Sequence, residues 1–97
     1  MVKILGYTYK VIRDGTIDMI GAAGRFHPKS QTLQIATDQC KEQEISTLLH
    51  EIVEALNYHQ QWSLEHKTIM SLEASLYQVL VDNGVDLSPL AREIESA

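Results

Sequence analysis

His50, Glu51 and Glu54 are the residues of this sequence whose types and spacing are most suited to chemistry. Apolar residues recur around them at helical spacing, which predicts an amphipathic helix capped by Asp38 and ending near Gln60. His50 and Glu54 are four residues apart, so they project from one face of this helix, with Glu51 beside them. A histidine and a carboxylate in this arrangement can bind one metal ion, although such residues more often form an ordinary solvated face.

Glu73 adds another carboxylate, because it falls inside the apolar stripe of the next predicted helix. That helix is expected to begin at a Ser63 cap and to end just before Gly84. An ionised carboxylate buried among apolar residues is unfavourable unless it is paired or bound to a metal. A short loop would make the two helices antiparallel neighbours, so that Glu73 faces His50 and Glu54.

Two interpretations of Glu73 are open. In the first, Glu73 completes a metal site with His50 and Glu54. In the second, it pairs with His66, His59 or a tyrosine hydroxyl and fixes the packing of the two helices. The metal interpretation is favoured, because the first helix already presents two residues able to share an ion with it.

The same segments resemble a known family of enzymes. Residues 47–56 resemble the active-site helix of the gluzincin zinc peptidases, whose motif is His-Glu-x-x-His, and residues 72–80 resemble the glutamate helix that follows it. Over residues 20–83 the chain is similar to the smallest members, the minigluzincins, and to short phage-encoded proteins of the same kind. The resemblance implies hydrolysis of peptide bonds by a metal-activated water.

The resemblance also implies roles for individual residues. His50 and Glu73 match metal ligands, and Glu51 matches the general base that takes a proton from the attacking water. Residues 32–37, a predicted strand, match the cleft-edge strand that holds the substrate in an extended form. The implied partner is a peptide or protein, and the implied cofactor is a divalent metal ion, zinc before manganese.

The chain departs from the family motif at Glu54, where gluzincins have their second histidine. Catalytic zinc sites of this class use two histidines and one glutamate, whereas His50, Glu54 and Glu73 supply one histidine and two carboxylates. The added negative charge makes the ion a weaker Lewis acid and favours harder metals such as manganese.

Four outcomes are compatible with this departure: a catalytic site with an altered metal, an inert bound metal, a metal-free pseudoenzyme, or a ligand set completed by another histidine. His66 is better placed for that role than His59, because it lies seven residues before Glu73 on roughly the same helix face. Tyr77 is an auxiliary candidate for binding an oxyanion, as is Tyr58, although packing is the favoured role of both.

The sequence therefore predicts a metal-dependent, gluzincin-like peptidase. The alternative is a catalytically inactive pseudopeptidase that binds peptides or proteins as a regulatory module. A purely structural pair of helices is a third interpretation, which predicts no metal.

The first third of the chain is rich in β-forming residues. Residues 3–13, 16–20 and 32–37 predict three antiparallel strands, the last of them at a sheet edge. Asp14 and Gly15 predict a tight hairpin turn between the first two.

The C-terminal part predicts, after the two long helices, a short helix over residues 90–95 that begins at Ser88 and Pro89. The expected fold is α+β: a three-stranded antiparallel sheet, two antiparallel helices and a short C-terminal helix, in a single domain over residues 1–97.

Composition excludes several other classes of function. The net charge is −5 with no clustered Lys/Arg stripe, which argues against nucleic acid as a partner. The longest apolar runs are too short for a membrane span. Cys40 is the single cysteine and the N-terminus does not resemble a secretory signal, so a cytoplasmic location is expected. Substrate and oligomeric state do not follow from the sequence.

Overall fold

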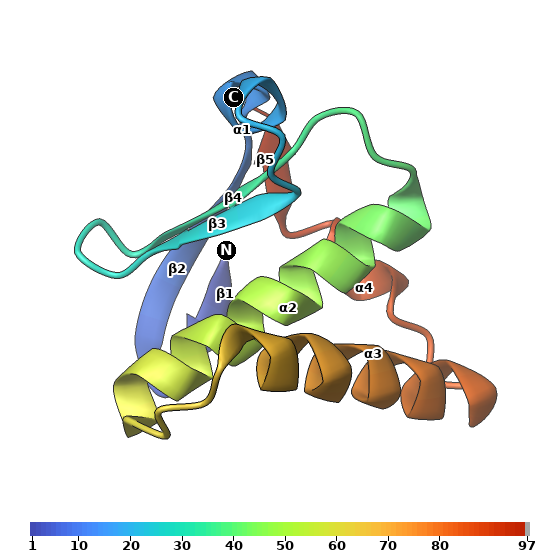
Figure 1. Ribbon diagram of the computed structural model, residues 1–97. Coiled ribbons are helices and arrows are strands. Elements are labelled where there is room, and N and C mark those ends of the chain that lie inside the picture. The colour runs from blue at the N-terminus through green and yellow to red at the C-terminus, as the bar shows by residue number, and fades with distance from the viewer. Residues whose placement is uncertain (97) are drawn as a thin grey trace.

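Strand β2 (Tyr7–Arg13) organises the sheet of this computed structural model, which describes residues 1–96 (Figure 1). The other strands are β1 (Val2–Ile4), β3 (Gly24–His27), β4 (Thr32–Ile35) and β5 (Ile94–Ser96). On one edge of β2, β1 pairs antiparallel with its first half and β5 pairs parallel with its second half. On the other edge lies β4, parallel to β2, followed by β3, antiparallel to β4.

The α+β class is confirmed, but the predicted three-stranded antiparallel sheet is wrong. Over residues 1–96 the sheet has five strands and is mixed. The reason is the route of the chain after β2. It leaves the sheet, returns along the far edge as β3, and turns back as β4 into the gap beside β2, which makes β4 parallel to β2. Sequence periodicity does not encode this order of strands.

The predicted hairpin at Asp14 and Gly15 is also wrong, because these residues begin a helix. Asp14 has an extended backbone, with φ −138°, and its carboxylate accepts a hydrogen bond of 3.0 Å from the backbone N–H of Thr16. It is thus the N-cap of α1 (Gly15–Met19), which replaces the predicted strand over residues 16–20. A type I′ turn would need positive φ at both central residues, which neither Asp14 nor Gly15 has.

β4 is not the edge strand that residues 32–37 were expected to form. It lies between β2 and β3, and it ends at Ile35. The free edge on this side of the sheet belongs instead to β3. The sequence does not predict this strand, because Gly21 and Gly24 weaken its β pattern. A turn at residues 28–31 joins the two strands.

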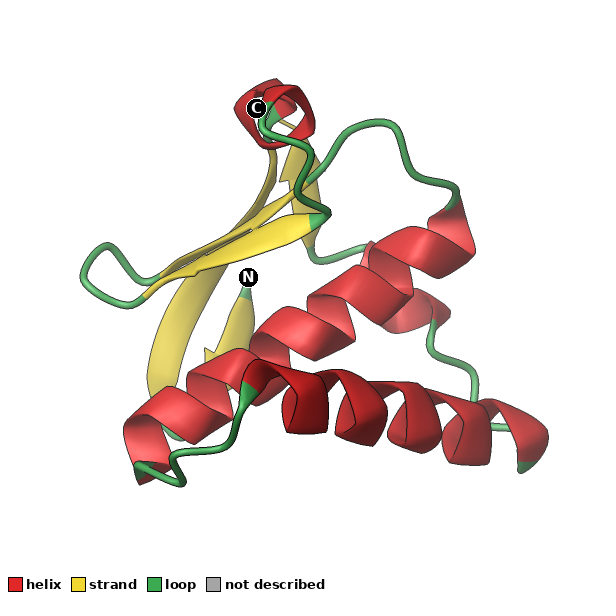
Figure 2. Cartoon of the chain, viewed as in Figure 1, coloured by secondary structure: helices red, strands yellow, loops and turns green. Residues whose placement is uncertain are grey.

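Helix α2 (Lys41–Gln60) confirms the predicted long amphipathic helix and its end. It starts three residues after Asp38, with Cys40 as N-cap and no side-chain capping hydrogen bond. Its side chains Leu48 and Ala55 are fully buried against residues of the sheet. The helix therefore crosses one face of the sheet, as Figure 2 shows.

Helix α3 (His66–Asp82) runs back along α2 at an angle (Figure 2). Its N-cap is Glu65, and the expected cap Ser63 lies instead in the connecting loop, with φ +59°. Gly84 has φ +77°, in agreement with the left-handed position predicted after the helix. Only Ile69 is buried among the residues of α3, so much of its apolar stripe remains on the surface.

The C-terminal segment differs from the predicted helix over residues 90–95. The short helix α4 (Ser88–Ala91) has Leu87 as its N-cap, and the chain then extends into β5. Ile94 is 6% exposed and joins the core beside β2. Burial of this side chain explains why a strand forms where local propensity predicts a helix. Among the described residues, no helix combines the length and apolarity needed to cross a membrane.

A partly buried ion pair links the end of β2 to the first turn of α2. Arg13 Nε donates to Glu44 Oε2 at 2.6 Å, and a terminal nitrogen of Arg13 donates to Glu44 Oε1 at 2.9 Å. Arg13 also donates to the backbone carbonyl of Ile94 at 3.3 Å. This two-pronged contact fixes α2 and β5 against β2, and it holds the pKa of Arg13 above its ordinary value.

Replacement of Glu44 by alanine should therefore lower the free energy of unfolding by about 2 kcal/mol, because it leaves the partly buried Arg13 without its carboxylate. Urea denaturation measures this change. Glu42→Ala, in the same turn but exposed, is the control and should change the value by less than about 0.5 kcal/mol. Equal effects of the two substitutions would contradict a stabilising role of the pair.

Candidate metal centre

His50, Glu54 and His66 converge where α2 meets the start of α3. Each offers a donor atom, and these atoms all lie within 4.8 Å of one another. Glu54 Oε2 lies 3.8 Å from Nε2 of His50 and 3.7 Å from Nδ1 of His66. The two imidazole rings meet edge to face, with their centres 5.3 Å apart.

These donors fit a tetrahedral metal ion. Zinc ligands at about 2.1 Å from the ion lie about 3.4 Å from one another, so the observed spacings require only small side-chain rotations to close. The set contains two histidines and one carboxylate, a composition used by catalytic zinc sites. His66 has 68% of its side chain exposed, against 15% for His50, so one side of the group is open to solvent.

The loop between the helices positions His66. Gln61 and Ser63 both have left-handed backbones, with φ +54° and +59°, and the side-chain oxygen of Asn57 accepts from the backbone N–H of Leu64 at 2.9 Å. The chain reverses within a few residues as a result, and the first residue of α3 comes to lie beside Glu54. The sequence indicates His66 only as an auxiliary candidate, because the conformation of this loop decides its position.

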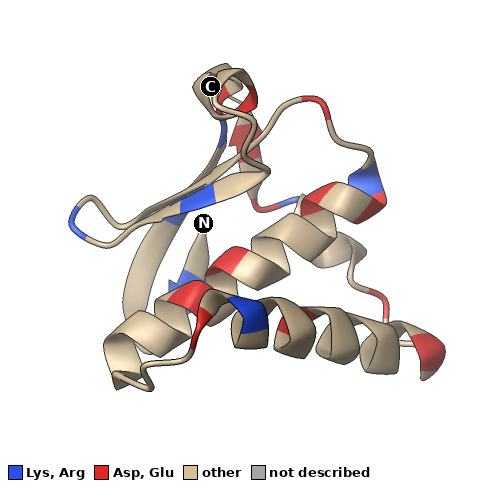
Figure 3. Cartoon of the chain, in the orientation of Figure 1, with Lys and Arg blue, Asp and Glu red and all other residues tan. Residues whose placement is uncertain are grey.

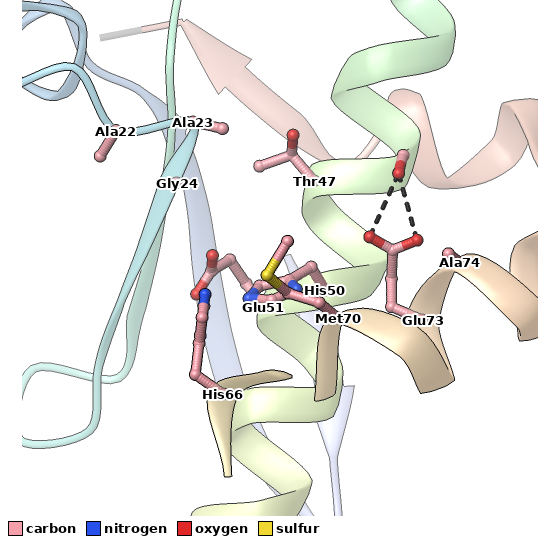
Figure 4. Close-up of a pocket in the computed structure, with 11 residues that line it drawn as sticks. Ala22, Ala23, Gly24, Thr47, His50, Glu51, His66, Met70, Glu73 and Ala74 are labelled. Atoms are coloured by element: carbon pink, nitrogen blue, oxygen red, sulfur yellow. Dashed lines mark hydrogen bonds between the residues drawn. The ribbon is translucent and has the colours of Figure 1, made fainter. Parts of the chain in front are cut away.

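Glu73, the predicted third ligand, lies outside this group. Both of its carboxylate oxygens are 3.3 Å from the hydroxyl of Ser46, which donates to them (Figure 4). It follows His66 by seven residues, which is about 10 Å along the helix. The two helices run antiparallel, so a residue farther from the loop on α3 meets α2 farther from the loop as well. Glu73 therefore meets Ser46, one turn before His50, and not Glu54.

Glu51 is buried between α2 and strand β3. Its side chain is 5% exposed, and one of its oxygens lies 3.0 Å from the place that a Cβ on Gly24 would occupy. Such a Cβ would also lie 2.7 Å from the methyl group of Thr47, so a glycine is required for β3 to approach this closely. Burial raises the pKa of Glu51 to about 8, and the nearby Glu54 carboxylate adds to the shift.

A groove runs on both sides of the group. A larger pocket of about 500 Å³ extends along α3 towards Glu73, and a smaller pocket of about 390 Å³ extends along β3 towards Phe26. The two pockets share Gly24, His50, Glu51 and His66 in their walls. The candidate ligands and Glu51 therefore lie at the middle of a continuous groove.

The outer edge of β3 borders this groove. The backbone N–H of Ala36 donates to the carbonyl of Ala23 at 2.8 Å. Because hydrogen-bonded and non-bonded pairs alternate in an antiparallel ladder, the N–H and C=O groups of Gly24 and Phe26 point away from β4. They are able to pair with an extended peptide lying in the groove.

The remaining candidates lie outside the ligand group. Tyr77 is half-buried on α3 and lines neither pocket, whereas Tyr58 lines the smaller pocket and packs edge-on against Phe26. His59 lies 2.6 Å from the hydroxyl of Tyr9 and stacks on Tyr7, which keeps it out of the ligand group. Burial also raises the pKa of Tyr9.

Comparisons of the chain with protein-family models, with curated proteins and with solved structures found no match. The functional assignment of this groove therefore depends on its own residues.

The geometry of the ligand group predicts that the protein binds one metal ion. After reconstitution with zinc and dialysis, the protein should retain about one equivalent by elemental analysis. His66→Ala should bind zinc at least about tenfold more weakly, since even outer-shell partners of a metal contribute that much. Glu73→Gln should retain the metal.

The matched control is His27→Ala, which removes a histidine bonded to Gln34 on the far side of β3. It should bind zinc as the unaltered protein does. Loss of metal from Glu73→Gln with retention in His66→Ala would instead support the ligand set His50, Glu54 and Glu73.

Burial of Glu51 predicts a dependence of stability on pH in the metal-free protein. Its pKa is about 8 in the folded protein against 4.5 for the free side chain, so the folded state binds the proton more tightly. The contribution of protonated Glu51 to the free energy of unfolding is fully present below pH ~4.5. This contribution is lost as the pH rises towards 8. Glu51→Gln should remove this loss, which amounts to about 3 kcal/mol between pH 5 and 7.5.

Urea denaturation of both proteins with a chelator present measures the difference. Parallel pH profiles would show that Glu51 is not desolvated in solution.

Proposed function

We propose that this chain is a metal-dependent peptidase of gluzincin-like design, with the ion held by His50, Glu54 and His66. The observation that carries the proposal is that these three donors and the buried Glu51 meet in one groove, beside the free edge of β3. The proposed set has the same composition as the gluzincin set, with the positions of one histidine and the glutamate exchanged. His66 would compensate for the glutamate at position 54.

The residues of the groove have separate tasks in this proposal. The outward backbone groups of β3 would hold a peptide extended across the site. His50, Glu54 and His66 would hold a divalent ion, zinc before manganese, which when bound activates a water and polarises the scissile carbonyl. Glu51 would accept a proton from the attacking water and return it to the departing amine.

The environment of Glu51 suits this task. Without a cation its raised pKa keeps it largely protonated at neutral pH. A divalent ion at the adjacent ligands would lower that pKa, because an opposite charge favours the ionised form. Glu51 would then be a base at neutral pH only when the ligands are loaded.

The second candidate is a pseudopeptidase that binds peptides without cleaving them. The open edge of β3 supports it, because strand pairing requires no metal. The two candidates share the groove and differ in whether a bound peptide is hydrolysed.

Replacement of Glu51 by glutamine tests the catalytic proposal. The zinc-loaded protein should hydrolyse a mixture of terminally blocked peptides, and Glu51→Gln should lower the rate by about 10²–10⁴-fold while retaining the metal. Mass spectrometry of the products and elemental analysis measure the two quantities.

Glu42→Gln removes an exposed glutamate of α2 and serves as the control, with an unchanged rate expected. If the zinc- and manganese-loaded proteins bind the peptides but cleave none of them, the peptidase proposal fails and the pseudopeptidase is favoured.

A further inference from the structure

The larger pocket has the form of a subsite next to the metal ligands. One end is bounded by His50, Glu51 and His66, and the other by the Ser46–Glu73 pair. Between these ends Figure 4 shows Ala22 and Ala23 before β3, Met70 on α3 and Thr47 on α2. Their apolar groups, which include the Thr47 methyl group beside Gly24, form most of this part of the wall.

The carboxylate of Glu73 meets no cation within residues 1–96. Its hydrogen bonds come from one hydroxyl, that of Ser46, at 3.3 Å to both oxygens. A carboxylate has about four acceptor positions, so the described residues leave most of them to solvent or to a bound group. A partly buried carboxylate with so few partners is well suited to bind a cation.

No lysine or arginine among residues 1–96 lines this pocket. Lys41 and Lys67 are the only lysines or arginines on α2 and α3, and both lie near the first turn of their helix (Figure 3). Lys67 lies on another surface with Thr68 and Ser71. Lys41 lies near Asp86, whose pKa is lowered mainly by hydrogen bonds from Ser88, with Arg92 and Lys41 adding to the shift.

We propose that the Ser46–Glu73 pair is a specificity subsite for a lysine or arginine side chain of the bound peptide. The inference rests on the proposed function, since the pocket adjoins the ligands that would hold the ion. Ser46 lies one helical turn, about 6 Å, from His50 along α2. A residue next to the scissile bond could therefore lay its apolar stem along the pocket walls and place its cationic head at Glu73.

A purely structural role for Glu73 predicts a different outcome. A contact that only joins α2 to α3 would change stability when removed, with no effect on which peptides are chosen. Charge reversal separates the two roles, because it should invert the preference rather than abolish it.

The experiment uses decapeptides of alanine and glycine with blocked ends, each carrying one lysine, arginine, norleucine or glutamate. Zinc-loaded protein should cleave next to lysine or arginine about tenfold faster than next to norleucine, a factor equivalent to about 1.4 kcal/mol. Glu73→Gln should reduce this ratio to about twofold or less, and Glu73→Lys should favour the glutamate peptide. Glu42→Gln should leave the ratio unchanged.

Binding of the same labelled peptides to zinc-loaded Glu51→Gln, measured by fluorescence anisotropy, tests the subsite without turnover. The lysine peptide should bind about tenfold more tightly than the norleucine peptide, and Glu73→Gln in this background should remove the difference. Cleavage or binding with no preference for a cation would overturn the subsite and leave the peptidase proposal standing. Cation-selective binding with no cleavage by the unaltered protein would overturn the peptidase proposal and support the subsite.

Discussion

Helix α2 packs against the sheet, α3 and α4, and the groove lies along the part of its surface that none of them covers. Its apolar side, which includes Leu48 and Ala55, is buried against the sheet. Arg13 of β2 fixes its first turn through Glu44, and α3 packs along another side. These contacts fix the rotation of the helix about its axis. They therefore also fix the positions of His50, Glu51 and Glu54 on the remaining side.

In the proposed metal site, His66 would compensate for the carboxylate at position 54. A set of His50, Glu54 and Glu73 would carry two carboxylates, and the ion would be a poorer Lewis acid. With His66 as the third donor, the set would contain two histidines and one carboxylate. Glu73 is then free to interact with Ser46 and with whatever enters the larger pocket.

Burial of Glu51 disfavours its ionised form in the metal-free protein, and it would suit the general base of the proposed site. The approach of β3 at Gly24 excludes water from its carboxylate, which raises the pKa to about 8. The same approach brings the free edge of β3 beside the ligands. The close approach of β3 thus lowers the free energy of unfolding of the metal-free protein. In the proposed function, the same approach would place a base, an ion and an extended peptide together.

The sequence by itself determined α2, and with it the common face of His50, Glu51 and Glu54, because helical periodicity is a local property of the chain. It also indicated α3 and the α+β class. Tertiary structure alone decided the order of the strands and the strand that follows α4, since both depend on which apolar surfaces are buried together. It also decided that His66 rather than Glu73 meets Glu54, because the left-handed residues of the loop and the angle between the helices set that contact, and neither has a periodic signal in the sequence.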